Sequence, residues 1–293
     1  QLCELFGVPR EALPTVLESA SRFGETDAAG ALPRRVPICG VMGDSQASLF
    51  AQRCFRPGMA KATFGTGTSV LLNVGDTFRP PQPGLVTALA WIWRARPTYA
   101  FEGLINFSAA TITWLKDQLG LIQSSAEVGP LAAAVEDNGG VYLVPAFAGL
   151  SAPCWSPGAR AAIVGLSAFS RREHIVRAAE EAIAYQIRDV LDLMRTEANL
   201  RLENLHADGG PTRDDFLMQF TADLAGVELI VSELPESSAW GAGTACLLGL
   251  GLCNSLDDLA ALPRQTRTYR PNMAPAKVKQ LHDGWLAAVK RVL

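Results

Sequence analysis

Histidine is scarce in this chain, and its potential metal ligands are not spaced as metal sites require. The three histidines, His174, His206 and His282, lie far apart, and the six cysteines form no C-x-x-C pair. Zinc sites built from these residue types usually need close pairs. We therefore expect no metal site made by this chain's histidines and cysteines. Scattered cysteines among apolar residues favour reduced, buried thiols, as in a cytoplasmic protein.

Two further absences narrow the class of protein. No apolar run approaches the ~20 residues that a membrane-spanning helix needs. The formal net charge of −3 provides no basic surface for nucleic acid or an anionic membrane. Hydrophobic residues make up 48% of the 293 residues, which is enough for a sizeable core in one large domain or two. The composition thus favours a globular protein and argues against nucleic acid or a membrane as its partner.

Hydrophobic periodicity predicts an α/β protein in which a run of strands is followed by helices that alternate with strands. The sequence Ser170-Arg171-Arg172-Glu173 predicts a capping box at the start of the longest helix. The proline-rich segment 76–84 is expected to be an exposed loop. Strands are predicted at 36–42, 60–64, 70–74, 85–91, 98–101, 141–144, 204–207 and 228–231, and helices at 10–19, 46–52, 105–119, 126–135, 174–198, 214–224, 239–249 and 276–292.

Two short motifs about twenty residues apart indicate phosphoryl transfer. Asp44 follows an apolar run in a glycine-flanked turn, where a carboxylate can take a proton from a substrate hydroxyl. The turn Gly65–Gly67 (GTG) follows a second apolar run, and such a turn exposes backbone N–H groups to a phosphate. Either motif alone is also compatible with an ordinary turn. Together they place a base at one end and a phosphate site at the other.

A third motif, Asp208-Gly209-Gly210, lies between a predicted strand and a predicted helix. Glycines at this point let a flat base or a ribose pack against the backbone, and the start of a helix favours a phosphate. A strand–Gly-Gly–helix sequence is common, so this motif indicates a nucleotide site only in combination with the other two motifs.

The order of the motifs resembles the FGGY family of carbohydrate kinases, most strongly its members that phosphorylate glycerol. The resemblance extends from about Pro9 to Val292 and rests on Gly43–Ala47 (GDSQA), Pro57–Lys61 (PGMAK) and Phe64–Thr68 (FGTGT). It implies an actin-like ATPase (ribonuclease H-like) fold, with a mixed sheet and flanking helices. It also implies ATP and Mg²⁺ as cofactors and the ATP-dependent phosphorylation of a hydroxyl group on a polyol or sugar.

The resemblance also implies roles for single residues. Asp44 would be the general base, the turn Gly65, Thr66 and Gly67 would bind the β- and γ-phosphates, and Gly209 and Gly210 would contact the adenosine. The other implied ligand contacts fall where the chain departs from the family. On the nucleotide side these are Ala109, Thr113 and Asp214, where the family has glycine, glutamine and asparagine. On the acceptor side they are Ser45 and Ser69, where the glycerol-phosphorylating members have glutamine and phenylalanine.

These departures leave alternatives open. A hydroxyl in place of a large apolar side chain enlarges and wets the acceptor pocket, so a pentulose, a tetritol or an aldonate is an alternative to glycerol. A non-catalytic actin-like nucleotide-binding module is a further alternative, although such a module would not need Asp44. Glu180 departs as well, since it lies where the family's second signature, within segment 161–181, has an apolar residue. We expect that segment to be structural.

The resemblance implies two domains, because the family contains the actin-like unit twice. Residues 1–54, with Asp44, are expected to be the end of the first domain, and residues 55–293 the second. Most of the first domain, with its phosphate loop and its Mg²⁺-binding aspartate, would then be missing. Assembly into a homo-oligomer is compatible with this interpretation.

Overall fold

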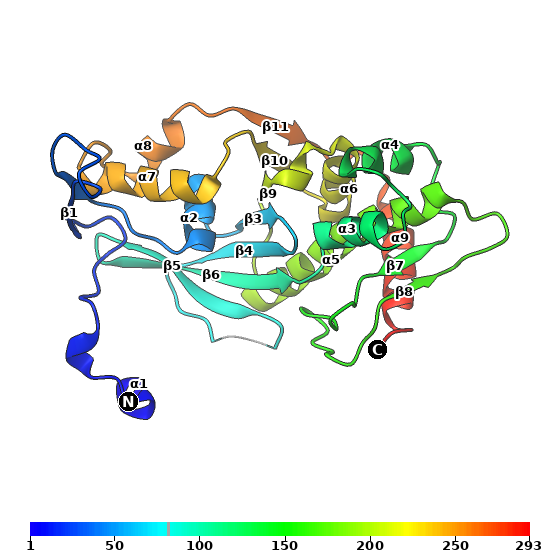
Figure 1. The fold of residues 1–293 in the computed structure, drawn as a ribbon, viewed down its shortest axis with the longest axis horizontal. Coiled ribbons are helices and arrows are strands. Elements are labelled where there is room, and N and C mark those ends of the chain that lie inside the picture. The colour runs from blue at the N-terminus through cyan, green and yellow to red at the C-terminus, as the bar shows by residue number, and fades with distance from the viewer. Residues whose placement is uncertain (81–82) are drawn as a thin grey trace.

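The computed structural model describes residues 1–80 and 83–293, and its centre is a seven-stranded mixed sheet (Figure 1). The central strands β3, β9 and β10 run parallel, and the remaining pairs are antiparallel. In spatial order the strands are β11 (Thr266–Tyr269), β10 (Leu229–Ser232), β9 (Asn204–Gly209), β3 (Met59–Phe64), β4 (Thr68–Gly75), β6 (Arg96–Ile105) and β5 (Val86–Trp93).

Helices cover both faces of the sheet (Figure 1). One face carries α2 (Asp44–Ala51) and α7 (Ser237–Gly249), with α8 (Leu256–Ala261) beside them. The other face carries the long helix α5 (Arg172–Ala198), and around it lie α3 (Ala109–Asp117), α4 (Val128–Ala133), α6 (Asp215–Ala225) and α9 (Pro275–Val289). The expected fold, a mixed sheet with flanking helices, is therefore confirmed.

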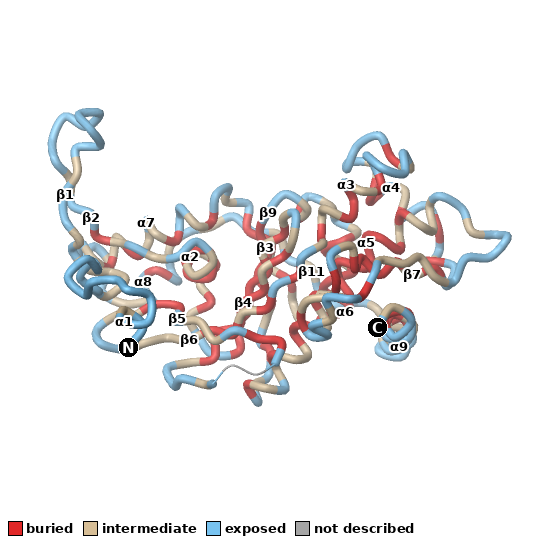
Figure 2. Tube along the Cα trace, turned by 60° about the horizontal axis from the view of Figure 1, so that its bottom comes forward, coloured by how far each residue is buried: buried red, intermediate tan, exposed pale blue. Residues whose placement is uncertain are grey.

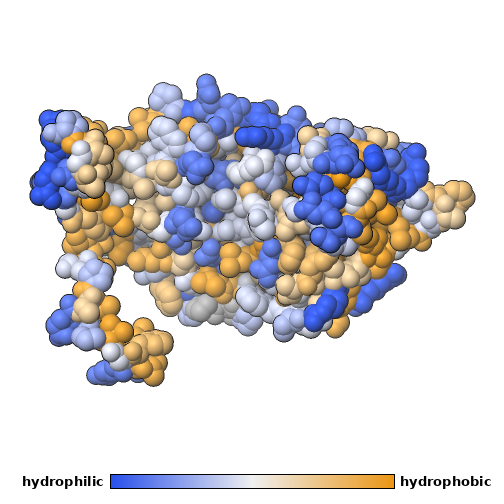
Figure 3. Space-filling view, viewed as in Figure 1, coloured by the Kyte–Doolittle hydropathy of each residue, from blue (hydrophilic) through white to orange (hydrophobic). Residues whose placement is uncertain are grey.

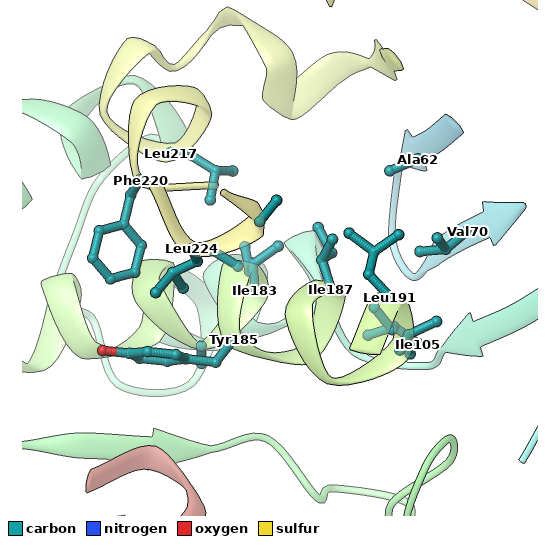
Figure 4. Close-up of a cluster of buried hydrophobic side chains, with 14 of the residues drawn as sticks. Ala62, Val70, Ile105, Ile183, Tyr185, Ile187, Leu191, Leu217, Phe220 and Leu224 are labelled. Atoms are coloured by element: carbon teal, nitrogen blue, oxygen red, sulfur yellow. The ribbon is translucent and has the colours of Figure 1, made fainter. Parts of the chain in front are cut away.

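Successive side chains along each strand point to opposite faces of the sheet, so the core has two layers. Ala60, Ala62 and Phe64 of β3 face α5, whereas Met59 of the same strand faces α2. Figure 4 shows Ile187 and Leu191 of α5 directed toward Ala62 and Val70, and Ile183 directed toward α6. In Figure 2 the buried segments concentrate along β3, β4 and α5. The sheet is thus packed by a core layer on each of its faces.

Smaller elements lie outside this body. Two short ladders pair β1 (Gly24–Thr26) with β2 (Val36–Ile38) and β7 (Tyr142–Val144) with β8 (Ala162–Val164). Helix α1 (Leu2–Phe6) projects at the lower left of Figure 1, and Figure 3 shows apolar side chains on that projection. Among the described residues, no helix is both long enough and apolar enough to cross a bilayer.

Three predictions about local structure are wrong. Only a 3-10 turn, Arg10–Ala12, forms in the segment expected to be helical, because Pro14 removes a backbone donor and restricts the residue before it. Helix α2 begins at Asp44, so this residue opens a helix and does not lie in a separate turn. The expected capping box is replaced by a bond from the Arg171 N–H to His174 Nδ1 (3.0 Å), while Ser170 Oγ accepts from Ser167.

The short peripheral elements β8, α8 and β11 were not predicted. Strand β11 alternates polar residues on an edge of the sheet and carries no apolar pattern that would reveal it. Most of the expected proline-rich loop lies outside strands and helices, and its residues 81 and 82 lie outside the described residues.

Candidate active site

Asp44 is exposed at the first turn of α2, at the carboxyl end of the central strands. Its Oδ1 accepts the Ser45 N–H (2.7 Å), and its backbone carbonyl accepts from Ser238 Oγ (2.9 Å) at the start of α7. One turn further along the same face of α2, Ser48 Oγ donates to Asp208 Oδ2 (2.8 Å) and lies 3.2 Å from Thr63 Oγ1. Asp44 therefore lies over the end of β3 that leads into the Gly65–Gly67 turn.

A buried polar cluster lies below this helix, on the same face of the sheet. Lys61 is only 1% exposed, and its Nζ donates to Thr63 Oγ1 (2.8 Å) and lies 3.5 Å from Ser69 Oγ. Ser69 Oγ in turn donates to Glu102 Oε1 (3.3 Å). Burial lowers the pKa of Lys61, and carboxylates around it act in the opposite direction, with Asp44 among them. Ser69 thus bridges a lysine and a glutamate.

Sequence reasoning did not identify Lys61 as part of a buried polar cluster. A lysine in the middle of an apolar strand was the available signal, because a buried lysine is seldom tolerated without polar partners. The cluster takes its residues from three strands, β3, β4 and β6, so only the folded chain reveals it.

The turn Gly65–Gly67 connects β3 to β4 and also caps α3. The carbonyls of Gly65 and Thr66 accept the N–H groups of Ala109, Ser108 and Ala110, at 2.9–3.1 Å. The Gly65 N–H is used inside the turn, where it donates to the Gly67 carbonyl (2.8 Å). The Thr66 side chain is exposed. A β-carbon at Gly67 would overlap the Ile105 carbonyl, so close packing explains this glycine.

A cavity of about 1050 Å³ opens beside α3, between that helix and α4, α5 and α6. Its walls include four of the predicted nucleotide contacts, Ala109, Thr113, Gly210 and Asp214. Ile112, Ile122 and Phe216 supply apolar surface, and the titratable side chains on its walls are those of Lys116, Glu180, Arg213, Asp214 and Asp215. A mostly apolar cavity with a few polar groups is typical of a small-molecule site.

The neighbouring glycines of the third motif have different structural roles. Gly209 has a φ of +103°, and a β-carbon there would overlap the Phe64 carbonyl of β3. A β-carbon at Gly210 would meet nothing within 4 Å. Gly209 therefore permits close strand packing, whereas Gly210 leaves the cavity wall open.

Gly210 and Arg213 also line a second cavity of about 520 Å³. Ser48, Thr63, Asp208 and Ser238 lie on the walls of this smaller cavity, so it extends from Gly210 toward the start of α2. The two cavities therefore adjoin at Gly210. The turn Gly65–Gly67 lines neither of them, but it holds the start of α3, whose residues line the larger one.

Sequence reasoning also missed the contribution of Glu180 to the larger cavity. Burial, and next the neighbouring Asp214, raise the pKa of Glu180 well above its usual value. The departure of Glu180 from the apolar residue of the family pattern was the available signal. Glu180 and Asp214 both line this cavity although they are 34 positions apart, and no local pattern indicates that.

The fold is that of the actin-like ATPases, in the form found in kinases that act on sugars. A family model described as the C-terminal domain of the FGGY family of carbohydrate kinases matches residues 60–249. The chain belongs to this family.

Curated relatives are similar over the whole chain. The glycerol kinase of Desulfitobacterium hafniense is 41% identical over 292 residues, which is 100% of this chain and 59% of the relative. The glycerol kinase of Shewanella frigidimarina is 43% identical over 292 residues, which is 100% of this chain and 58% of the relative. The chain thus spans less than two thirds of the length of these relatives.

Solved structures show the same likeness. The structure of Plasmodium falciparum glycerol kinase with ADP has a TM-score of 0.92 at 32% identity, with coverage of 100% of this chain and 59% of the other. The xylulose kinase of Rhodospirillum rubrum has a TM-score of 0.80 at 26% identity, with coverage of 99% and 59%.

Proposed function

We propose that the protein containing this chain transfers the γ-phosphoryl group of ATP to a hydroxyl of a small polyol or sugar. The observation that carries this proposal is the adjoining pair of cavities, with the backbone carbonyl of Asp44 hydrogen-bonded to Ser238 on the wall of the smaller one. A nucleotide base in the larger cavity would direct its phosphates past Gly210 toward Asp44. The likeness to kinases, one of them determined with ADP, supports the same assignment.

In this proposal each motif has one task. Asp44 accepts the proton of the attacking hydroxyl, and because the transition state of phosphoryl transfer is loose, it chiefly orients that hydroxyl. The Thr66 hydroxyl, which is exposed, contacts the β- and γ-phosphates, whereas the Gly65 N–H is used inside the Gly65–Gly67 turn. Gly210, with Ala109, Thr113 and Asp214, receives the adenosine, and Gly209 holds Gly210 in place by letting β9 approach β3.

Mg²⁺ is proposed as the metal that accompanies ATP and neutralises charge on its phosphates. Magnesium prefers oxygen ligands, and one carboxylate of this chain fits that preference. Asp208 Oδ1 is buried, has no hydrogen-bond partner among the described residues, and belongs to a side chain on the wall of the smaller cavity. Asp208 Oδ2 is held by Ser48 and Gln52, so the carboxylate is already oriented.

Glycerol is the first candidate for the acceptor, because the curated relatives are glycerol kinases. A longer or more hydroxylated acceptor is the second candidate. Ser69 favours it, since its hydroxyl joins Lys61 to Glu102 and offers a polar wall to additional hydroxyl groups. Ser45, beside the base, adds another hydroxyl to this side.

The two-domain organisation is likewise a proposal. Residues 1–54 would end a first domain and residues 55–293 would form the second, and the family match at 60–249 supports this division. Catalysis would then need the part of the relatives that this chain does not span. Closure of the two domains would exclude water from the reacting phosphate.

A panel of acceptors tests the proposed function. The intact protein is incubated with Mg-ATP and glycerol, a tetritol, a pentulose or an aldonate, and both the phosphorylated product and the ADP are quantified. We expect stoichiometric transfer to at least one member of the panel. Binding of ATP without transfer to any of them would leave the non-catalytic nucleotide-binding module as the correct alternative.

A further inference from the structure

Arg213 lies at the boundary where the two cavities adjoin. Among the described residues, Gly210 and Arg213 are the two that line both cavities. Gly210 has no side chain, so the guanidinium of Arg213 is the charged group that the two cavities share. Arg213 is exposed, and its side chain makes no hydrogen bond or ion pair within the described part of the chain, where the ion pairs nearby belong to Arg267.

The other cations on the cavity walls already have carboxylate partners. Lys116, on the larger cavity, lies beside Asp117, with its Nζ 3.2 Å from Oδ1. Arg267, on the smaller cavity, pairs with Asp215 (2.9 Å from Nη1 to Oδ1) and also donates to the Thr212 carbonyl (2.8 Å). The cation at the boundary is therefore the one that remains available to a ligand.

The backbone on either side of Arg213 is held in place. Thr212 is buried, and its Oγ1 donates to the Gly209 carbonyl (2.7 Å). Asp214 caps α6, because its Oδ1 accepts two N–H groups of the first turn, at 3.0 and 3.3 Å. A free guanidinium on a fixed backbone loses only its own side-chain freedom when it binds a ligand.

Carboxylates outnumber cations on the walls of both cavities. The larger cavity has three acidic and two basic side chains, those of Glu180, Asp214, Asp215, Lys116 and Arg213. The smaller cavity also has three acidic and two basic side chains, those of Asp208, Glu233, Glu236, Arg213 and Arg267. A nucleotide phosphate is negative as well, so it gains most from a cation that it meets on its path. A guanidinium suits this task, because its planar fork binds phosphate oxygens through two hydrogen bonds.

We propose that Arg213 binds the α-phosphate of the nucleotide, where the ligand passes from the larger cavity into the smaller one. This inference rests on the proposed function, in which the base occupies the larger cavity and the terminal phosphates approach Asp44. The α-phosphate joins the nucleoside to those terminal phosphates, so it crosses the boundary that Arg213 lines. Arg213 thereby favours phosphorylated nucleosides over adenosine.

The test compares adenosine, AMP and ADP as ligands of the intact protein, without an acceptor. Calorimetry measures ADP binding directly, and displacement of ADP measures AMP and adenosine. Arg213→Gln removes the charge, and we expect it to bind AMP and ADP about tenfold more weakly than the wild type, as for the loss of a hydrogen bond to a charged group. Adenosine should bind the two proteins equally, within about twofold.

Two further variants serve as controls. Arg213→Lys keeps the positive charge but loses the planar fork, so its AMP and ADP affinities should lie between those of the wild type and Arg213→Gln. Arg201→Gln removes another exposed arginine, which lines neither cavity, and should bind all three ligands as the wild type does. Thermal unfolding should be the same for all four proteins, because the Arg213 side chain has no partner among the described residues to lose.

Ionic strength provides a second measurement. Salt screens the attraction between an exposed guanidinium and a phosphate. The difference in ADP affinity between the wild type and Arg213→Gln should therefore shrink as salt is added. A difference that salt does not reduce would contradict a contact between charges, even where adenosine binds too weakly to displace ADP.

The outcomes separate the inference from the proposed function. If ADP binds Arg213→Gln as tightly as the wild type, or if adenosine loses as much affinity as ADP, the inference is wrong while the nucleotide site stands. A loss for ADP that AMP does not share would place Arg213 at a later phosphate and overturn the assignment to the α-phosphate. If none of the three ligands binds any of the proteins, the nucleotide site itself is wrong, and the inference falls with it.

Discussion

Carboxyl groups in three different environments surround the two cavities. Asp44 is exposed at a helix start, Asp208 is buried and held by Ser48 and Gln52, and Glu180 is buried in the wall of the larger cavity. Burial, followed by the neighbouring Asp214, raises the pKa of Glu180. In the proposed function, Asp44 serves as the base and Asp208 as an oxygen ligand for Mg²⁺, and these two roles differ with what each carboxylate contacts.

His206 provides a prediction about stability at acid pH. Burial, then Arg264 and Arg53, lower the pKa of this imidazole to about 3. The unfolded chain, with a histidine pKa near 6.5, binds a proton in the intervening range that the folded chain does not. Stability should therefore fall between pH 6.5 and pH 3, by up to about 1.4 kcal/mol per pH unit from this group.

Urea unfolding of the wild type and of His206→Gln at pH 7, 5 and 4 tests this prediction. The variant should lose less stability on acidification, whatever its stability at pH 7. Parallel curves for the two proteins would mean that His206 is already protonated, or is accessible to water, in the folded state.

Glycines on α7 give a prediction at the scale of elements. A β-carbon at Gly241 would overlap the Ala47 carbonyl of α2, whereas one at Gly243 would meet nothing within 4 Å. Gly241→Ala should separate α7 from α2, move Asp44, and lower both stability and phosphorylation. Gly243→Ala should leave activity unchanged and stabilise the fold by about 0.5–1 kcal/mol, because alanine favours the helix.

Thermal unfolding and the phosphorylation rate of the two variants provide the comparison. Equal losses in both would contradict the close packing of α2 on α7. Retained activity in Gly241→Ala would show that the position of α2 does not matter for the reaction.

Gly209 and Gly210, at the end of β9, allow the effect of backbone packing on stability to be tested separately from the effect of ligand contact on binding. Gly209→Ala should destabilise the fold strongly, because of both its positive φ and its contact with Phe64. Gly210→Ala should leave stability within about 0.5 kcal/mol but weaken ADP binding, since its β-carbon would enter the cavity. Urea unfolding and ADP titration measure the two effects, and a Gly210→Ala protein with unchanged ADP affinity would remove Gly210 from the proposed site.

The sequence predicted much of the fold, but only part of the arrangement at the candidate site. Hydrophobic periodicity predicted α5 and the central strands, because the 3.6-residue period of a helix and the 2-residue period of a strand are visible in the local sequence. Motifs likewise drew attention to Asp44 and Gly210. The polar cluster around Lys61 and the proximity of Glu180 to Asp214 were not predicted, because they depend on side chains that only tertiary packing brings together. The start of α2 was placed two residues late because glycine at 43 suggested a turn.

At the scale of the whole molecule, the chain spans 59% of the glycerol kinase of Desulfitobacterium hafniense. We expect the isolated 293-residue chain to show no turnover with millimolar Mg-ATP and the acceptor panel, whereas the intact protein does. An assay of both under identical conditions decides this. Turnover by the isolated chain would contradict the proposal that two domains close around the phosphates.

The central claim is that Asp44 faces the terminal phosphate of a nucleotide held beside Gly210. Its most direct test is Asp44→Asn in the intact protein, with Asp76→Asn, an exposed aspartate in the loop after β4, as the matched control. We predict that Asp44→Asn lowers kcat by about 10² to 10⁴ while ADP affinity stays unchanged, and that the control behaves as the wild type. An undiminished kcat in Asp44→Asn would contradict the account.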